Sequence, residues 1–222
     1  MAAMSPSLRS GPFLVAISFL LLAFVADARE ARAQNVQDFL LILEAGDIGE
    51  RRKALIWLAE HADESAVRPI LAALKQDADG GVRTLAETAL WSIWTRSGDS
   101  DVDQLMKIGT FLMANGEFQR AELVFSEIIG LKPDFAEGYN KRATLWYMKG
   151  EYQRSLDDID LTLKRNPHHF GALSGAGLCL LKLERPVDAL TFFERALAIN
   201  PNLAGIKRLT KGIRSTLDKQ TI

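Results

Sequence analysis

Residues 136–169 read AEGYNKRATLWYMKGEYQRSLDDIDLTLKRNPHH, and blocks of the same length lie directly before and after them, at 102–135 and 170–203. The three blocks align without gaps, and their prolines stand 34 residues apart, at Pro133, Pro167 and Pro201. Other matched positions hold small residues, at Gly109, Ala143, Gly177, Ala121, Ser155 and Ala189, and large residues, at Phe125, Ile159 and Phe193. A fixed period of this length indicates a structure built by stacking copies of one unit.

The middle block shows which unit is repeated. Tyr139, Ala143 and Trp146 share one face of a helix, at i, i+4 and i+7. A break follows at 149–151, and a second amphipathic face then runs through 152–163. Pro167 disfavours helix in the residue before it, so the second helix ends there. Each block is therefore predicted to be a helix–turn–helix.

These matched positions resemble the tetratricopeptide repeat (TPR) family over 102–203. The resemblance implies an all-α fold, a right-handed α-solenoid of helix–turn–helix repeats. Two features depart from the family's pattern. The third block has Glu184, Arg185 and Pro186 where the others have glycine, glutamate and an aromatic residue, so we expect a different turn there. The middle block has Arg142 where the family prefers leucine.

The resemblance also implies a binding surface. In TPR proteins the first helices of the pairs line a concave groove that holds an extended peptide or a partner's helix. On this sequence the groove comprises Met106, Thr110, Asn140, Thr144, Tyr147, Met148, Ser174, Leu178 and Lys182. Members that clamp a carboxylate use Lys, Asn and Arg, but four of those places hold Met106, Thr110, Gly171 and Gly175. We therefore expect no such clamp, but hydrogen bonds from Asn140 and Thr144 and packing on Tyr147 and Met148.

The repeats are followed by one more helix, predicted over 204–219. Its apolar residues lie on one helical face, at Ile206, Leu209, Ile213 and Leu217, and basic residues cover much of the rest. A repeat array needs a terminal helix with one apolar and one polar face to seal its open edge. Residues 204–222 are accordingly predicted to be a C-terminal capping helix and tail.

Residues 34–99 form a second predicted helical segment, with helices at 36–45, 50–62, 65–76 and 82–95 separated by turns rich in Gly and Asp. Residues match at an offset of 31, as Leu40/Leu71, Leu43/Leu74 and Arg52/Arg83. The segment resembles a HEAT-like repeat pair over 36–96, and a degenerate TPR pair is the alternative. Residues 96–101 are the predicted junction, with Ser100 or Asp101 as the N-cap of the first TPR helix.

The first 33 residues have the pattern of a secretory signal peptide. Arg9 is followed by an uncharged apolar stretch at 12–26, and small residues then fit cleavage after Ala28 or Ala33. The stretch is shorter than the roughly 20 residues that span a bilayer as a helix. We expect a periplasmic or secreted protein whose signal is cleaved. The alternative is a protein anchored to the inner membrane by residues 12–26.

The charge balance and the single cysteine exclude several classes of protein. The 222-residue chain has 27 basic and 28 acidic side chains, so no basic excess points to nucleic acid. One cysteine allows neither an internal disulfide nor a Cys-rich zinc site. The apolar neighbours of Cys179 favour buried packing over reactivity.

The other polar and glycine clusters have ordinary structural interpretations. His61 is placed at a helix C-terminus, His168 and His169 on a surface loop, Asp157, Asp158 and Asp160 on a solvated face, and Gly171, Gly175 and Gly177 in close helix packing rather than a dinucleotide loop. We therefore predict no catalytic, cofactor, metal or small-molecule site. A metal-binding or enzymatic helical-repeat protein would have to use the two adjacent histidines and the acidic cluster.

The function that these patterns favour is a non-enzymatic, exported scaffold or adaptor that binds a protein or peptide in the groove, in the cell envelope. An inner-membrane-anchored assembly factor is the alternative. So short an array also offers its ends for self-association.

Overall fold

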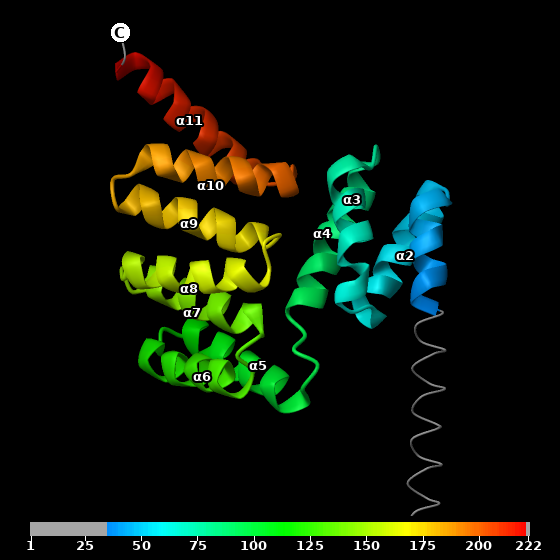
Figure 1. Cartoon of the computed structure of the whole chain (residues 1–222), viewed down its shortest axis with the longest axis horizontal. Coiled ribbons are helices and arrows are strands. Elements are labelled where there is room, and N and C mark those ends of the chain that lie inside the picture. The colour runs from blue at the N-terminus through cyan, green and yellow to red at the C-terminus, as the bar shows by residue number, and fades with distance from the viewer. Residues whose placement is uncertain (1–34, 221–222) are drawn as a thin grey trace, which may run out of the picture.

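The structure, a computed structural model, describes residues 35–220, and every regular element in that range is helical (Figure 1). A helix at 35–45 is followed by α2 (Ile48–His61), a short 3-10 turn (Glu64–Ala66), α3 (Val67–Gln76) and α4 (Gly80–Trp94). Three helix pairs come next, α5 (Ser100–Ala114) with α6 (Phe118–Leu131), α7 (Ala136–Met148) with α8 (Tyr152–Arg165), and α9 (Phe170–Lys182) with α10 (Pro186–Ile199), and they are followed by α11 (Ala204–Gln220). The predicted all-α solenoid of helix–turn–helix repeats is confirmed. The predicted signal segment, 1–33, lies outside the described residues.

The matched small and large positions set how closely the two helices of a repeat approach. A Cβ atom added at Gly109 would lie 2.6 Å from Cε1 of Phe125, and one added at Gly177 would lie 2.3 Å from Cε1 of Phe193. Both phenylalanines are fully buried. Each ring therefore occupies the space that a larger residue on the partner helix would need, which explains why these positions recur with the repeat.

The three turns inside the repeats share one geometry. A backbone hydrogen bond of 2.9 Å closes each turn, and its donor and acceptor recur every 34 residues, from Glu117 to Leu112, Glu151 to Trp146 and Arg185 to Leu180. The residue before the donor has a positive φ in each case, at Gly116 (76°), Gly150 (80°) and Glu184 (59°). The expected difference in the third turn is therefore wrong. The closing hydrogen bond and Pro186, which starts α10, hold a glutamate in a conformation that favours glycine.

The N-cap of the first TPR helix lies one residue before Ser100 and two before Asp101, the two predicted positions. The Asp99 side chain accepts hydrogen bonds from the backbone N–H groups of Asp101 (2.9 Å) and Val102 (3.2 Å), which makes Asp99 the N-cap of α5. Ser100 and Asp101, the predicted caps, both lie in the first helical turn. A carboxylate so placed also complements the positive end of the helix dipole.

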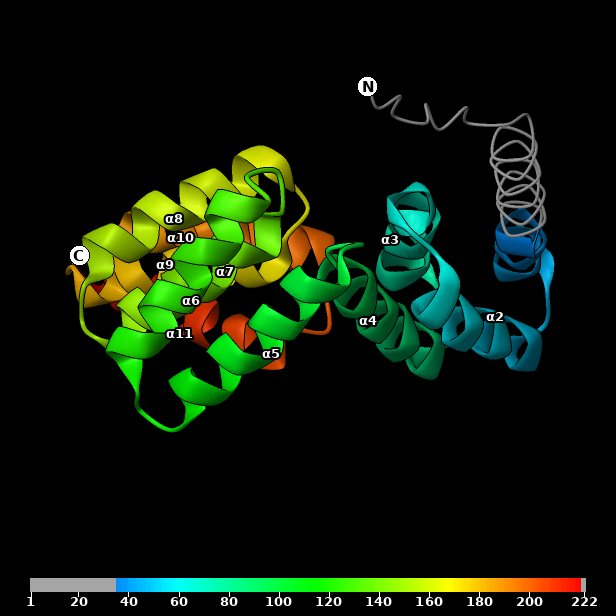
Figure 2. The same ribbon diagram turned by 90° about the horizontal axis from the view of Figure 1, so that it is seen from below.

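The N-terminal helices lie beside the repeat array rather than continuing its stack, as two perpendicular views show (Figures 1 and 2). Trp91 and Trp94 near the end of α4 contact Phe170 at the start of α9. Ile199, the last residue of α10, and Leu203, just before α11, join the same hydrophobic cluster. The segment therefore docks against the loops that link the later repeats. Its HEAT-like origin stays a prediction.

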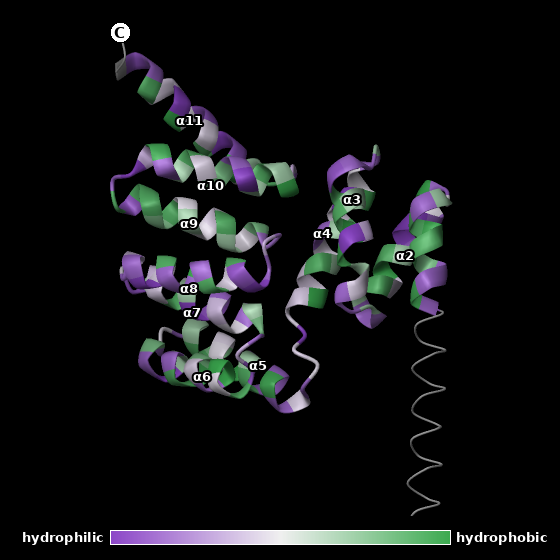
Figure 3. Ribbon diagram, viewed as in Figure 1, coloured by the Kyte–Doolittle hydropathy of each residue, from purple (hydrophilic) through white to green (hydrophobic). Residues whose placement is uncertain are grey.

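Hydropathy is distributed unevenly over the terminal helix. Hydrophobic and strongly hydrophilic residues alternate along α11 (Figure 3), and Leu209 on it is 39% exposed.

Among the helices of residues 35–220, none combines the length and the apolar character needed to cross a membrane.

Candidate protein-binding groove

The nine residues predicted to line the groove lie on the first helices α5, α7 and α9. We call the surface that they share with Gly171 and Gly175, the two glycines of α9 at clamp positions, the groove face. Thr144, Met148 and Lys182 are exposed, with Met148 at 49%, whereas Thr110, Tyr147, Ser174 and Leu178 are half-buried. Met106 and Asn140 are buried. The exposed and half-buried residues are the ones that a partner could reach directly.

Asn140 is engaged by its own helix. Its Nδ2 donates to Oε2 of the buried Glu137 at 3.0 Å, and its backbone carbonyl accepts from the Thr144 hydroxyl at 2.9 Å. Tyr147 differs, because its ring lies 5.6 Å from that of Tyr152, at a tilt of 58°, and remains half-buried. Tyr147 and Met148 therefore offer apolar surface for contact, while the Asn140 amide is already committed to the fold.

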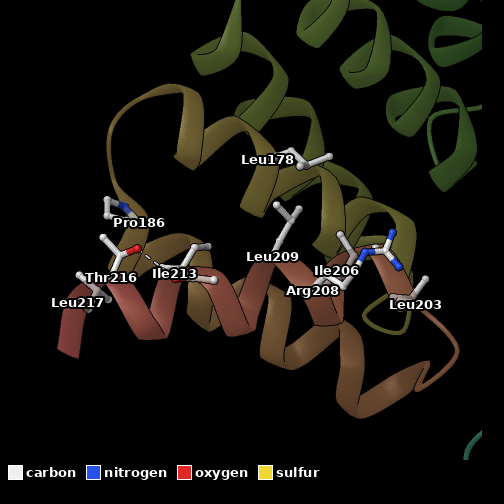
Figure 4. Close-up of a pocket in the computed structure, with 11 residues that line it drawn as sticks. Leu178, Pro186, Leu203, Ile206, Arg208, Leu209, Ile213, Thr216 and Leu217 are labelled. Atoms are coloured by element: carbon white, nitrogen blue, oxygen red, sulfur yellow. Dashed lines mark hydrogen bonds between the residues drawn. The ribbon is translucent and has the colours of Figure 1, made fainter. Parts of the chain in front are cut away.

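An open apolar groove lies at the C-terminal end of the groove face, between α9 and α11. Its volume is about 970 Å³, and we call it the α11 groove. Leu209 points from α11 toward Leu178 of α9 (Figure 4). The other lining residues are Pro186, Leu203, Gly205, Ile206, Arg208, Gly212, Ile213, Thr216 and Leu217. Only Leu178 among the predicted groove residues belongs to this set.

The 34-residue repeat period explains which residues α11 contributes to the α11 groove. Adding 34 to the groove-face positions Gly171, Ser174, Gly175, Leu178 and Lys182 gives Gly205, Arg208, Leu209, Gly212 and Thr216. All five of these α11 residues line the groove. The helix predicted to be a cap thus stands where the first helix of a fourth repeat would stand and extends the groove face. The periodicity held the signal that would have found these residues.

The opposite end of the groove face, at the start of α9, is covered by α4. A Cβ atom added at Gly171 would lie 2.5 Å from Cη2 of Trp91. The Trp94 ring is stacked on the His169 imidazole, with centroids 5.0 Å apart and planes 22° from parallel. No larger residue fits at Gly171 unless Trp91 moves.

A buried carboxylate and imidazole lie beneath these tryptophans. His169 caps α9, because its Nδ1 accepts from the Ala172 N–H at 3.0 Å, so the proton on Nε2 is the one donated to Oε2 of Glu137, also at 3.0 Å. Lys141 Nζ lies 3.3 Å from the other carboxylate oxygen. Burial alone would raise the pKa of Glu137, but the hydrogen bond from His169, the charge of Lys141 and the Asn140 amide together lower it.

Sequence comparison identifies the repeats. A tetratricopeptide repeat family profile matches residues 150–204. A TPR repeat-containing protein of Rhizobium etli is 31% identical over 143 residues, which cover 64% of this chain and 70% of that protein. This chain belongs to the tetratricopeptide repeat family. The mouse tetratricopeptide repeat protein 12 is 26% identical over 65% of this chain, but the match spans only 19% of its length.

Solved structures give the same fold for the TPR array. The first TPR of Spaghetti (RPAP3), bound to an HSP90 peptide, superposes with a TM-score of 0.52 at 20% identity, covering 54% of this chain and 96% of that one. The Sgt2 TPR domain from Aspergillus fumigatus has a TM-score of 0.52 at 18% identity, covering 55% and 83%. At these identities the likeness concerns the fold.

Two sequence interpretations of the TPR array are wrong. His169 was placed on a surface loop but is fully buried, because Glu137 and Trp94 receive its ring; His168 alone is exposed. Asp158 was placed on a solvated face but is buried and forms two 2.8 Å hydrogen bonds with Arg142. Arg142 replaces the leucine that the family prefers, so the unusual arginine and the buried aspartate neutralise each other.

The other positions considered in the sequence analysis are the single cysteine and the glycines of α9. Cys179 is buried as expected, its Sγ lies 3.2 Å from the Ser155 hydroxyl, and burial raises the pKa of its thiol. Gly171, Gly175 and Gly177 lie on α9, as expected for helix packing. Within residues 35–220, no group of three or more His, Cys, Asp or Glu side chains is arranged to hold a metal ion.

Proposed function

We propose that this TPR protein is an exported, non-enzymatic scaffold that captures a segment of another protein on its groove face. The observation that supports this best is that apolar side chains on successive first helices and on α11 remain accessible, namely Tyr147 and Met148 on α7, Leu178 on α9 and Leu209 on α11. The chain covers the other end of the groove face itself but leaves this part open. Membership of a family in which Spaghetti's first TPR holds an HSP90 peptide is consistent with such a role.

Export is the part of the proposal that comes from the sequence. Arg9, the apolar stretch at 12–26 and the small residues before positions 29 and 34 are what a signal peptidase recognises. We expect the secreted product to begin at Gln34, or at Arg29 if cleavage follows Ala28. Intact mass of the exported protein decides this, since a product that keeps residues 12–26 contradicts a cleaved signal and indicates a membrane anchor.

Groove variants test the binding role. Asn140 is unsuitable, because its amide is bound to buried Glu137 and its loss would disturb the fold. Tyr147→Ala combined with Met148→Asp removes apolar contact surface and adds a charge at an exposed site. We expect affinity capture from the native envelope fraction to lose the partner with this double variant.

The matched control is Leu123→Asp, at a 72% exposed position on α6, a helix that contributes no residue to the groove face. It adds the same charge to the same repeat array, so the partner should still be captured. Capture by the double variant at the level of the control contradicts the groove assignment. Circular dichroism melting of both variants shows whether each remains folded.

A further inference from the structure

The lining of the α11 groove is poor in groups that could hydrogen-bond to a partner's backbone. Most of the side chains that line it are aliphatic, for example Leu178, Leu209 and Ile213. Of its two side chains with N–H or O–H donors, the Thr216 hydroxyl already donates to the Gly212 carbonyl at 3.1 Å, which leaves Arg208. An extended peptide would bring many unsatisfied N–H and C=O groups into these walls. A helix satisfies its own backbone, so a helix is the conformation that this groove fits.

Two glycines on α11 provide room for such a helix. Gly205 and Gly212 are two helical turns apart and both line the groove. A Cβ atom added at either position would meet no heavy atom within 4 Å. The groove residues on α11 extend from Gly205 to Leu217, about 18 Å at 1.5 Å per residue. A partner helix of three to four turns could therefore lie along α11 with its backbone close to the glycines.

The charge around the groove indicates the partner's charge. α11 contains five basic residues, at Lys207, Arg208, Lys211, Arg214 and Lys219, and one acidic residue, at Asp218. Arg214 pairs with Glu194 at 2.6 Å, and Lys207 and Lys211 lie on the face of α11 away from the groove, but no described carboxylate lies within ion-pair distance of Arg208 in the groove lining. Lys182 adds an exposed cation in the last turn of α9. Acidic side chains flanking the apolar face of a bound helix would meet Arg208 and Lys182.

From these observations we propose that the α11 groove binds an acidic amphipathic α-helix of a partner protein. The proposal depends on the proposed scaffold function and specifies its partner. Leucine-like side chains at i, i+3 or i+4, and i+7 enter between Leu178 and Leu209, and glutamates or aspartates beside them face Arg208 and Lys182. A second copy of α11 does not suit the groove, because its own positive charge would be repelled.

A designed peptide tests the proposal directly. The probe is a fluorescein-labelled 16-residue helix with leucines at i, i+4, i+7 and i+11, glutamates flanking them and alanines elsewhere. We expect saturable binding to the purified protein by fluorescence anisotropy. A matched probe with lysines in place of the glutamates, and another with a central proline, should each bind at least tenfold more weakly.

Two groove variants locate the site. Leu209→Asp places a carboxylate on the exposed apolar wall, and Arg208→Glu reverses the charge at the rim; we expect each to weaken the acidic probe at least tenfold. Lys211→Glu is the control for charge, because it makes the same change on the face of α11 that lies away from the groove. Leu131→Asp, at a 61% exposed position on α6, is the control for the added carboxylate. Both controls should bind the acidic probe with an affinity within about twofold of that of the parent protein. An equal loss of affinity in the groove variants and the controls contradicts this location of the binding site.

The outcomes separate this proposal from the one on which it depends. If the acidic probe does not bind, or the lysine probe binds as well, the acidic-helix proposal is wrong, whatever the capture experiment shows. If the envelope partner is still lost with the Tyr147 and Met148 variant, the scaffold function stands and its ligand is of another kind. Light scattering that shows concentration-dependent dimers abolished by Leu209→Asp would instead assign the groove to a second copy and overturn the proposal.

Discussion

At the start of α9 the groove face is covered by a helix of the same chain, whereas beside α11 it stays open. The covered end contains polar groups that need partners, namely Glu137 and His169, and the tryptophans of α4 seal them from water. The open end is lined mainly by aliphatic side chains and one arginine. Buried polar groups need hydrogen-bond partners within the fold, whereas an apolar surface can stay exposed until a partner binds, at a modest cost in free energy. The difference suggests which end is structural and which is available for binding.

Removing an aromatic ring from the covered end should have the largest effect on stability. Trp94 is buried against His169 and Phe170, so Trp94→Ala is expected to lower the free energy of unfolding by about 3–5 kcal/mol. Leu209→Ala at the open end, where the side chain is 39% exposed, should cost no more than about 0.5 kcal/mol. Urea denaturation followed by tryptophan fluorescence and circular dichroism measures both. Similar losses at the two sites would mean that the open end is as much a part of the core as the covered end.

Two glycines of α9 sharpen the comparison within a single helix. A Cβ atom at Gly171 would lie 2.5 Å from a Trp91 ring atom, whereas one at Gly175 would have its nearest contact at 3.5 Å. Gly171→Ala should therefore displace α4 and cost about 1–3 kcal/mol through overpacking. Gly175→Ala should be neutral or stabilise by up to about 1 kcal/mol, because alanine favours helix. Limited proteolysis at residues 95–99 reports the displacement, and equal cleavage of both variants counts against close docking of α4.

The repeats could be predicted from the sequence because their contacts are local and periodic. The 34-residue spacing of Pro133, Pro167 and Pro201 fixed the three helix pairs, and Gly109 with Phe125 indicated how the helices of a pair approach. Groove positions follow from the same period, including those on α11. Periodicity says nothing about accessibility, however, so burial of Met106 and Asn140 emerged only from the structure.

Contacts that cross between regions could not be read from the pattern. Nothing in the sequence near Trp94 indicates that it stacks on His169, because the two come together only when the N-terminal helices fold back beside the later repeats. His169 looked like a loop residue because it follows Pro167 and His168, while its partner Glu137 lies 32 residues earlier, at the other end of the same repeat. Asp158 was misjudged for the same reason, since Arg142 comes from the other helix of its repeat. A polar residue's burial depends on a partner that sequence spacing does not reveal.

The smallest expected effect is that of acid pH on the free energy of unfolding. It tests the buried Glu137 carboxylate at the covered end. The pKa of Glu137 is lowered in the folded protein, so its contribution to stability is complete above the unfolded value of about 4.3 and is lost as the pH falls through the folded value. The stability difference between the parent protein and Glu137→Gln should therefore shrink between pH 5.5 and 3. Asp160→Asn is the control, because its carboxylate is exposed and pairs with Lys164 at 2.5 Å on the protein surface. Denaturant midpoints across this range measure both differences. If the Glu137→Gln difference is independent of pH, or grows toward acid, the ionised carboxylate does not stabilise the covered end, and packing of the tryptophans alone distinguishes it from the open one.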